Sequence, residues 1–213
     1  MSAGHMKSPM HIGIIGAGHV GGTLGRRFAA IGHTVTFGAR DPAKTRAELA
    51  DPTLAVGPIP DLRGCDAVIL ATPWAGTVAA IQALDPVPGQ IVIDATNPIA
   101  GRLEGLSPGG SDSGGETVQR AAPQARVVKA FNTCGYEVMA DPSFAQGNAC
   151  MPVCGDDAEA RRLAMALARA IGFDPLDCGP LRHARYVEPM AMVWITRAIL
   201  LGAGRRWAFA TVG

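Results

Sequence analysis

A glycine-rich turn near the start of the chain constrains its fold more than any other feature. Residues 12–15 form a short apolar run that leads directly into the sequence Gly-Ala-Gly-His-Val-Gly at 16–21. A helix-like stretch follows at 23–31, and a second apolar run covers 33–37. This order predicts a strand, a tight turn, a helix and a second strand, which is the arrangement that carries a dinucleotide in many α/β proteins.

Each glycine of the turn has a separate physical task. Gly16 permits the tight turn out of the strand, and Gly18 lets the backbone approach a pyrophosphate. Gly21 lets the helix pack closely on the sheet. The phosphates of a bound dinucleotide would then lie on the free N–H groups at the helix N-terminus. The alternative interpretation is a glycine-rich turn that holds no ligand.

The end of the second strand favours a phosphorylated ribose. Binders of the unphosphorylated cofactor usually place Asp or Glu here, and a carboxylate would repel a 2′-phosphate. Arg40 occupies this position instead and offers a planar guanidinium to a phosphate, with Lys44 four residues further on. Asp41 is interpreted as the cap of a helix that begins at Pro42. The sequence therefore favours NADP(H) over NAD(H), unless Arg40 and Lys44 are only solvated surface charges.

Short apolar runs alternate with helical stretches along the chain. The expected strands are 12–15, 34–37, 67–71, 91–94, 126–131, 151–154 and 173–177. The expected helices are 23–31, 42–50, 76–84, 116–122 and 158–171, with one or two more in 184–209. Most of the runs lack polar alternation, as parallel strands buried on both faces do. The pattern predicts an α/β fold, a Rossmann-type doubly wound parallel sheet with a small C-terminal α/β extension that ends in helices.

The chain is divided into three parts on this pattern. Residues 1–9 are interpreted as a tag or a disordered segment, and 10–148 as an NADP-binding Rossmann domain. Residues 149–213 form the small extension, which we expect to continue the sheet and to contribute a homodimer contact. The segment 101–115 holds six glycines and is expected to be a loop, either a lid over the cofactor or a passive surface loop.

Composition excludes several classes of function. A net charge of +1 gives no overall attraction to nucleic acid or to an anionic membrane. No apolar run is long enough to span a bilayer, and no signal peptide is evident. The five cysteines are scattered, without metal-ligand spacing. We therefore expect reduced thiols, no metal site and a cytoplasmic location.

Seven short motifs follow one another along nearly the whole chain, at 16–21, 38–40, 72–74, 94–98, 128–133, 152–157 and 177–181. Each motif is weak alone, but their common order is specific for one superfamily. Taken together they resemble the coenzyme F420-dependent NADP oxidoreductases, a family that shares its fold with the cytosolic domains of six-transmembrane ferric reductases. The stretch Lys129-Ala-Phe-Asn-Thr133 is more similar to the ferric reductase domains and to bacterial homologues than to archaeal deazaflavin enzymes.

The resemblance implies a set of cofactor-binding residues. Those around the pyrophosphate would be Gly16, Ala17, Gly18, His19, Val20 and Gly21, and those around the 2′-phosphate Ala39, Arg40 and Lys44. The others would be Thr72 and Pro73 beside the adenine-side ribose and diphosphate, and Asn97, Thr133 and Cys134 near the nicotinamide. Many members of the family have Ser where this chain has Ala39, so one hydroxyl donor to the phosphate is missing here.

Hydride transfer between two stacked rings requires no general acid or base when the acceptor is a flavin or deazaflavin. No catalytic residue is therefore assigned. Trp74 lies at the carboxyl end of the third expected strand and is a candidate wall for a flat ring. Pro98, Phe131 and Met190 are further candidates, although core packing is the favoured interpretation of the last two.

Lys129 has two interpretations. It is a candidate proton donor for a carbonyl or imine acceptor. Since it lies within an expected strand, a surface or edge lysine is the favoured interpretation.

Three functions are compatible with these observations. The first is an NADPH-dependent oxidoreductase that exchanges a hydride with a flavin-like acceptor such as coenzyme F420 or a flavin. The second is an NADPH-dependent reductase of a small carbonyl or imine compound. It is disfavoured because only about sixty residues follow Cys150, fewer than a helical substrate domain usually needs. The third is a non-catalytic NADPH-binding sensor domain.

Overall fold

The computed structural model describes residues 8–212 of the 213-residue chain. The interpretation of 1–9 as a tag therefore falls outside the described residues, apart from Ser8 and Pro9. The main sheet consists of β1 His11–Ile15, β2 Thr34–Ala39, β3 Ala55–Pro58, β4 Ala67–Leu70, β5 Ile91–Asp94, β8 Arg126–Lys129, β11 Cys150–Gly155 and β12 Asp174–Asp177.

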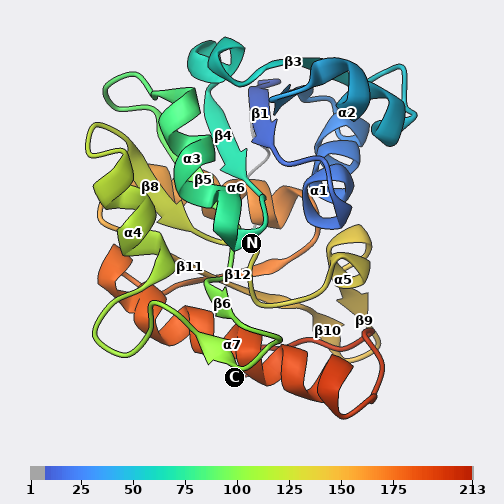
Figure 1. Cartoon of the computed structure of the whole chain (residues 1–213). Helices are drawn as coiled ribbons and strands as arrows, with labels where there is room; N and C mark the ends of the chain where they lie inside the picture. Colours follow the sequence, from blue (N-terminus) through green and yellow to red (C-terminus); the bar gives the residue numbers. More distant parts are fainter. Residues whose placement is uncertain (1–7, 213) are drawn as a thin grey trace.

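These eight strands form one sheet in the order β12-β11-β8-β5-β4-β1-β2-β3 (Figure 1). Every neighbouring pair is parallel except β8 and β11, which run antiparallel. The predicted Rossmann-type α/β fold is confirmed, and the β8–β11 pair makes the sheet mixed rather than wholly parallel. The strands β11 and β12 extend the same sheet beyond residue 148.

Helices cover both faces of the sheet. They are α1 His19–Ala30, α2 Pro42–Leu49, α3 Trp74–Leu84, α4 Gly114–Ala121, α5 Tyr136–Ala140, α6 Ala158–Ala170 and α7 Ala184–Ile195. Shorter elements are the 3-10 turns η1 Ile59–Gly64 and η2 Leu181–His183, and the π-helical turn η3 Thr196–Leu200. Two small hairpins pair β6 Ile99–Ala100 with β7 Gly105–Leu106, and β9 Ser143–Phe144 with β10 Gly147–Asn148.

The core divides into two layers because successive strand residues point to opposite faces. Ile12 and Ile14 of β1 belong to the layer that α1 and α6 cover, whereas Ile15 belongs to the layer under α3 and α4. Both layers are apolar along most of each strand. The pattern changes at the carboxyl ends of β5 and β8, where Asp94 and Lys129 are buried.

One strand was missed in the sequence, and one helix begins earlier than predicted. The edge strand β3 was missed, because its four residues include Gly57 and Pro58, which strands rarely carry. The helix expected at 23–31 begins at His19, directly after the capping residue Gly18. The buried glycines in its first turns have low helix propensity, so the sequence does not predict a helix there, but they allow the helix to pack closely on the sheet.

The segment 101–115 is more ordered than the predicted loop. Its first part belongs to the β6–β7 hairpin, and its last two residues begin α4. Ser113 caps this helix by accepting a hydrogen bond from the Glu116 N–H, and its hydroxyl donates to the Glu116 carboxylate at 2.7 Å.

Of the range 184–209, in which one or two helices were expected, only the part as far as Leu200 is helical. The chain from 201 to 212 has no regular structure, and the carbonyl of Phe209 accepts a hydrogen bond from the N–H of Cys150 at 2.8 Å. This tail therefore lies along the start of β11.

The structure shows the state of the cysteines and whether any described helix could cross a membrane. All five cysteines are free thiols, and only Cys178 is more than marginally exposed. Within residues 8–212, no helix combines the length and the apolar character that a bilayer crossing requires.

Candidate functional site

The glycine turn between β1 and α1 is packed too tightly for side chains at two of its three glycines. Gly16 has a φ of +107°, and a Cβ there would lie 2.4 Å from the carbonyl oxygen of Ala71. A Cβ on Gly21 would lie 1.8 Å from the carbonyl oxygen of Gly16. A Cβ on Gly18, in contrast, would meet no atom within 4 Å. Gly18 therefore borders open space, as a backbone that approaches a ligand must.

The N-terminus of α1 opens onto this space. Gly18 is the capping residue, no side chain caps the helix, and the first turn contains no acidic residue. Ala17 and Val20 are half-buried, and His19 is exposed. The helix has twelve residues, and the unsatisfied N–H groups and the dipole at its N-terminus make that end a suitable anion site.

Arg40 follows β2 at the same edge of the sheet. Its side chain is exposed, and it has no hydrogen bond or ion pair with any other residue that the structure describes. The carboxylate of Asp41 accepts a hydrogen bond from the N–H of Lys44 at 3.0 Å, so Asp41 caps α2 as predicted. Lys44 is exposed and lies 3.8 Å from Glu48. A guanidinium that forms no ion pair with a carboxylate is well suited to a phosphate.

The segment after β4 anchors the following helix. The hydroxyls of Thr72 and Thr77 lie 3.0 Å apart, and Pro73 caps α3. The indole N–H of Trp74 donates to the carbonyl of Ser107 at 3.1 Å, and the half-buried ring packs on the core layer under α3. Trp74 therefore ties the segment after the β6–β7 hairpin to the start of α3.

A pair of amides joins the segments that follow β5 and β8. Asn97 donates to the carbonyl of Asn132 at 2.9 Å, and the Asn132 amide donates to the Asn97 side-chain oxygen at 3.0 Å. Among the described residues, the side-chain oxygens of Asn132 and Thr133 are buried without a hydrogen-bond partner. Sequence analysis did not select Asn132 as a site residue, although it lies in the 128–133 motif.

Phe131 and Cys134 are core residues. Phe131 is fully buried with a φ of +59°, and its ring meets Phe28 and Phe173 edge to face at 6.3 and 6.2 Å. The favoured prediction of core packing therefore applies to Phe131. Burial raises the pKa of the Cys134 thiol to about 12, so this group stays protonated.

The interpretation of Lys129 as a surface or edge lysine is wrong. Its side chain is fully buried, and its Nζ lies 2.7 Å from Asp94 and 2.8 Å from Glu188. It also donates to the carbonyl of Thr96 at 2.8 Å. Burial alone would lower the pKa of Lys129, but the two carboxylates raise it above its ordinary value. Because all three N–H donors are occupied, none remains for a substrate.

Tyr136 is a second residue that sequence analysis missed. Its ring stacks on His19 of the glycine turn, with centroids 4.5 Å apart and planes inclined by 15°. The guanidinium of Arg205 lies 5.2 Å from the Tyr136 ring and pairs with Glu137. The stack holds α5 against the start of α1. No local sequence pattern predicts a contact between residues this far apart.

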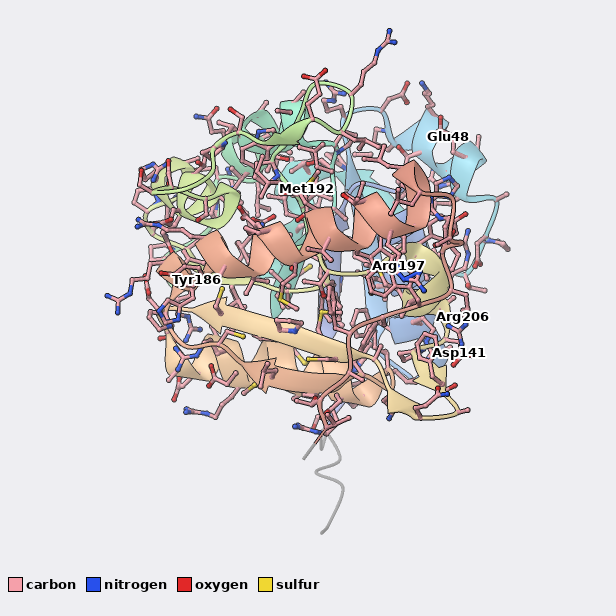
Figure 2. All side chains as sticks on the ribbon, turned by 90° about the horizontal axis from the view of Figure 1, so that it is seen from below. Glu48, Asp141, Tyr186, Met192, Arg197 and Arg206 are labelled. Carbon is pink, nitrogen blue, oxygen red and sulfur yellow. The ribbon has the colours of Figure 1, made fainter. Side chains whose placement is uncertain are left out.

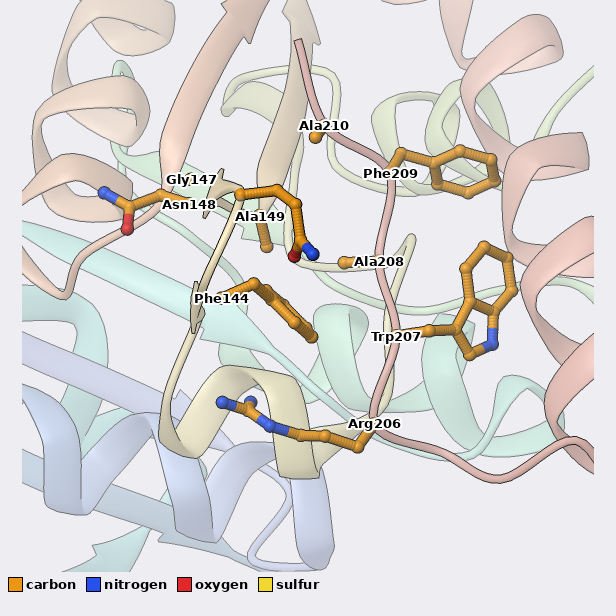
Figure 3. Close-up of a pocket in the computed structure, with 10 residues that line it drawn as sticks. Phe144, Gly147, Asn148, Ala149, Arg206, Trp207, Ala208, Phe209 and Ala210 are labelled. Carbon is orange, nitrogen blue, oxygen red and sulfur yellow. The ribbon is translucent and has the colours of Figure 1, made fainter.

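A separate hollow of about 260 Å³ lies elsewhere, between the β9–β10 hairpin and the C-terminal tail (Figure 3). Phe144 and Trp207 are among its lining residues, and Arg206 lies over the ring of Phe144 at 4.6 Å. None of the predicted site residues lines it. Among the described residues there is also no cluster of three or more metal-ligating side chains.

The fold and the turn together define a class. A parallel strand, a glycine turn and an uncapped helix N-terminus at the carboxyl edge of the sheet are the parts of a Rossmann-type nucleotide-binding protein.

Comparisons with known proteins narrow this class. A family model described as NADP oxidoreductase coenzyme F420-dependent matches residues 11–98. A solved structure from Arthrobacter sp. FB24, named as an F420-dependent NADP-reductase, is 32% identical with a TM-score of 0.88, covering 96% of this chain and 100% of that one. This chain belongs to the coenzyme F420-dependent NADP oxidoreductase family.

In other matches, this chain covers only part of the length of the matched protein. The metalloreductase STEAP3 of Rattus norvegicus is 32% identical over 192 residues, which make up 87% of this chain and 37% of STEAP3. The chain spans 36–37% of the length of the curated relatives it matches. A reductive aminase from Aspergillus terreus has 17% identity and a TM-score of 0.66, over 92% of this chain and 64% of the aminase, and shows the fold alone.

The residues present fit the NADP of this family. The open space at Gly18 and the bare N-terminus of α1 suit a pyrophosphate, and the unpaired Arg40 suits a 2′-phosphate. The buried, unpartnered oxygens of Asn132 and Thr133, in the segment that follows β8, would gain hydrogen-bond partners from a cofactor bound there.

Two alanine variants separate folding from binding in the glycine turn. We expect Gly18→Ala to fold like the wild type, because its Cβ meets nothing, and to bind NADPH about tenfold or more weakly, because the Cβ fills the space for the pyrophosphate. Gly21→Ala should lower the free energy of unfolding by about 1–3 kcal/mol through overpacking. Urea unfolding and NADPH titration measure the two effects, and normal NADPH binding by Gly18→Ala would contradict the assignment.

Proposed function

We propose that this protein transfers a hydride between NADP(H) and a flavin-like acceptor such as coenzyme F420 or a flavin. One observation carries the proposal: an exposed, unpaired Arg40 ends β2 beside the uncapped N-terminus of α1. The membership of the chain in the F420-dependent NADP oxidoreductase family supports the same cofactor and reaction class.

The cofactor would lie across the carboxyl edge of the sheet. In this proposal Ala17 to Val20 contact the pyrophosphate, and Thr72 and Pro73 lie beside the adenine-side ribose and diphosphate. Arg40 and Lys44 hold the 2′-phosphate. Ala39 contributes no hydroxyl, so the guanidinium supplies most of the preference for NADPH over NADH.

NADPH supplies the hydride, and the protein is required only to orient the two rings and to keep water away. The Asn97–Asn132 pair fixes the two segments that face the nicotinamide, and Thr133 adds a hydroxyl. No residue is assigned a role in proton transfer, because a flavin-like acceptor needs none for the hydride step itself.

Reduction of a small carbonyl or imine compound is the second candidate. This chain shares its fold with a reductive aminase, of which it covers 64%. Lys129, the one candidate proton donor, has its donors occupied by Asp94, Glu188 and Thr96. A non-catalytic NADPH sensor is the third candidate.

A homodimer and a cytoplasmic location complete the proposal. The free cysteines favour a reducing compartment. Tyr186, Val193 and Leu200 are spaced by seven residues on the helical segment formed by α7 and η3, and they are 71%, 56% and 55% exposed. A row of exposed apolar side chains on one helix face is suited to contact with a second copy. Figure 2 shows α7 lying across one end of the molecule, with Tyr186 near its start and Arg197 beyond its end.

Replacement of Arg40 tests the cofactor assignment. Arg40→Ala should weaken NADPH binding about ten- to hundredfold, since hydrogen bonds to a charged group contribute roughly 1.5–3 kcal/mol, and should leave NADH binding unchanged. Fluorescence titration of each cofactor measures this. Arg169→Ala, which removes an exposed arginine from α6, is the matched control. Equal losses for NADPH and NADH in Arg40→Ala would refute a role for Arg40 in phosphate recognition.

The acceptor is tested by following NADPH oxidation with F420, FMN, FAD and riboflavin in turn. We expect turnover with F420 or a free flavin, because hydride transfer to such a ring needs no added acid or base. Turnover with carbonyl or imine compounds alone would instead support the second candidate. NADPH binding without turnover of any acceptor would support the sensor function.

The dimer is tested by light scattering at micromolar concentration. The wild type should have twice the monomer mass, and Val193→Asp should be monomeric, because the new charge would be buried in the contact. Val87→Asp, at an exposed valine between α3 and β5, is the matched control and should remain dimeric. A monomeric wild type would contradict the proposed dimer.

A further inference from the structure

A buried ion cluster lies beneath the segment that follows β5. Asp94 and Lys129 are paired directly across the β5–β8 register, and both are completely buried. Glu188 of α7 is 1% exposed and completes the cluster at 2.8 Å from the lysine nitrogen. One cation and two carboxylates therefore meet at the α4 side of the sheet.

Each carboxylate also accepts hydrogen bonds from backbone N–H groups. One oxygen of Asp94 accepts hydrogen bonds from the N–H and the hydroxyl of Thr96 at 2.9 and 2.7 Å. The two oxygens of Glu188 accept from the N–H groups of Gly114 and Gly115, each at 2.9 Å. These two donors begin α4, where the helix dipole favours a negative charge. The cluster thus joins the segment after β5, the start of α4 and α7.

Space around the cluster is limited. A Cβ on Gly114 would lie 3.0 Å from Glu188, and a Cβ on Gly115 would lie 3.4 Å from the Cε of Lys129. The absence of side chains at these two positions lets the helix start approach the cluster closely.

Stability alone does not account for this arrangement. Burying an ion pair costs desolvation that its attraction often only balances, and well-packed apolar residues commonly replace such pairs without loss of stability. The cluster instead fixes the positions of the groups around it, because the Lys129 ammonium donates three charged hydrogen bonds to acceptors on β5, on the segment after it and on α7. One of those acceptors is the carbonyl of Thr96, the residue before Asn97.

We propose that Lys129 is a positioning residue for the hydride transfer: with Asp94 it fixes the 94–98 turn so that Asn97 meets Asn132 at the nicotinamide side. This inference rests on the proposed function. It assigns Lys129 no contact with substrate and no proton transfer. Its effect reaches the cofactor through Thr96 and Asn97.

The test uses a neutral cluster that still folds. In the variant Asp94→Asn/Lys129→Met/Glu188→Gln, the amide oxygen at position 94 continues to accept from Thr96, and no buried charge is left unpaired. The single amide oxygen at position 188 accepts from one of the Gly114 and Gly115 N–H groups and releases the other. We expect kcat to fall about tenfold or more, since small displacements of a bound ring have large effects on rate. Affinity for 2′,5′-ADP, a probe without nicotinamide, should stay within about twofold of the wild type because the phosphate site is untouched.

A second ion pair between the same two helices provides the control. Arg185 of α7 pairs with Glu116 of α4 at 2.8 Å but does not contact the 94–98 turn. Glu116→Gln/Arg185→Met therefore loosens α4 from α7 and should leave kcat unchanged. Urea unfolding of both variants shows whether each is folded under assay conditions.

The outcomes separate this inference from the proposed function. A wild type that binds neither NADPH nor 2′,5′-ADP overturns both. A wild type that binds NADPH, combined with a folded neutral variant of unchanged kcat, overturns only the role of Lys129. An equal loss of 2′,5′-ADP affinity also overturns it, since that would indicate general damage. If no acceptor is turned over, the fluorescence of bound NADPH replaces kcat as the readout, and an unchanged spectrum in the neutral variant overturns the role.

Discussion

The contact between Gly21 and the carbonyl of Gly16 is the constraint on which the rest of the site depends. Any side chain at Gly21 would overlap that oxygen, so α1 can start where it does only because both residues are glycine. This close approach brings the helix N-terminus to the carboxyl edge of β1, next to the ends of β2 and β4. The residues that follow those strands then face a common space, which explains how Arg40 and Thr72 come to belong to one site.

The sequence predicted the parts of the fold that local rules control. The glycine turn, the buried parallel strands and the cap at Asp41 each depend on residues within a few positions of one another, and all three agree with the structure. Lys129 was misread because its two partners, Asp94 and Glu188, lie far away in sequence. A lysine in an apolar strand looks like an edge residue until the opposite charges that let it be buried are found.

Asn132 and Tyr136 were missed for a related reason. Asn132 contacts Asn97 and Tyr136 contacts His19, both across the edge of the sheet. Neither contact produces a periodic pattern in the sequence. Both residues follow β8, whereas the family model ends at residue 98. In the proposed site, the pyrophosphate contacts thus come from one compact motif, and the proposed nicotinamide contacts come from scattered residues that only the fold brings together.

The helix α7 extends from the buried ion cluster at Lys129 to the surface of the molecule. Its inward face carries Glu188, which reaches Lys129, together with apolar residues such as Trp194 that pack on the core. Its outward face carries Tyr186 and Val193, which are exposed. Glu188 and the exposed side chains thus belong to one helix, so a second copy bound at Tyr186 and Val193 would contact the element that holds Lys129. The same helix therefore connects the proposed dimer contact with the geometry of the proposed hydride transfer.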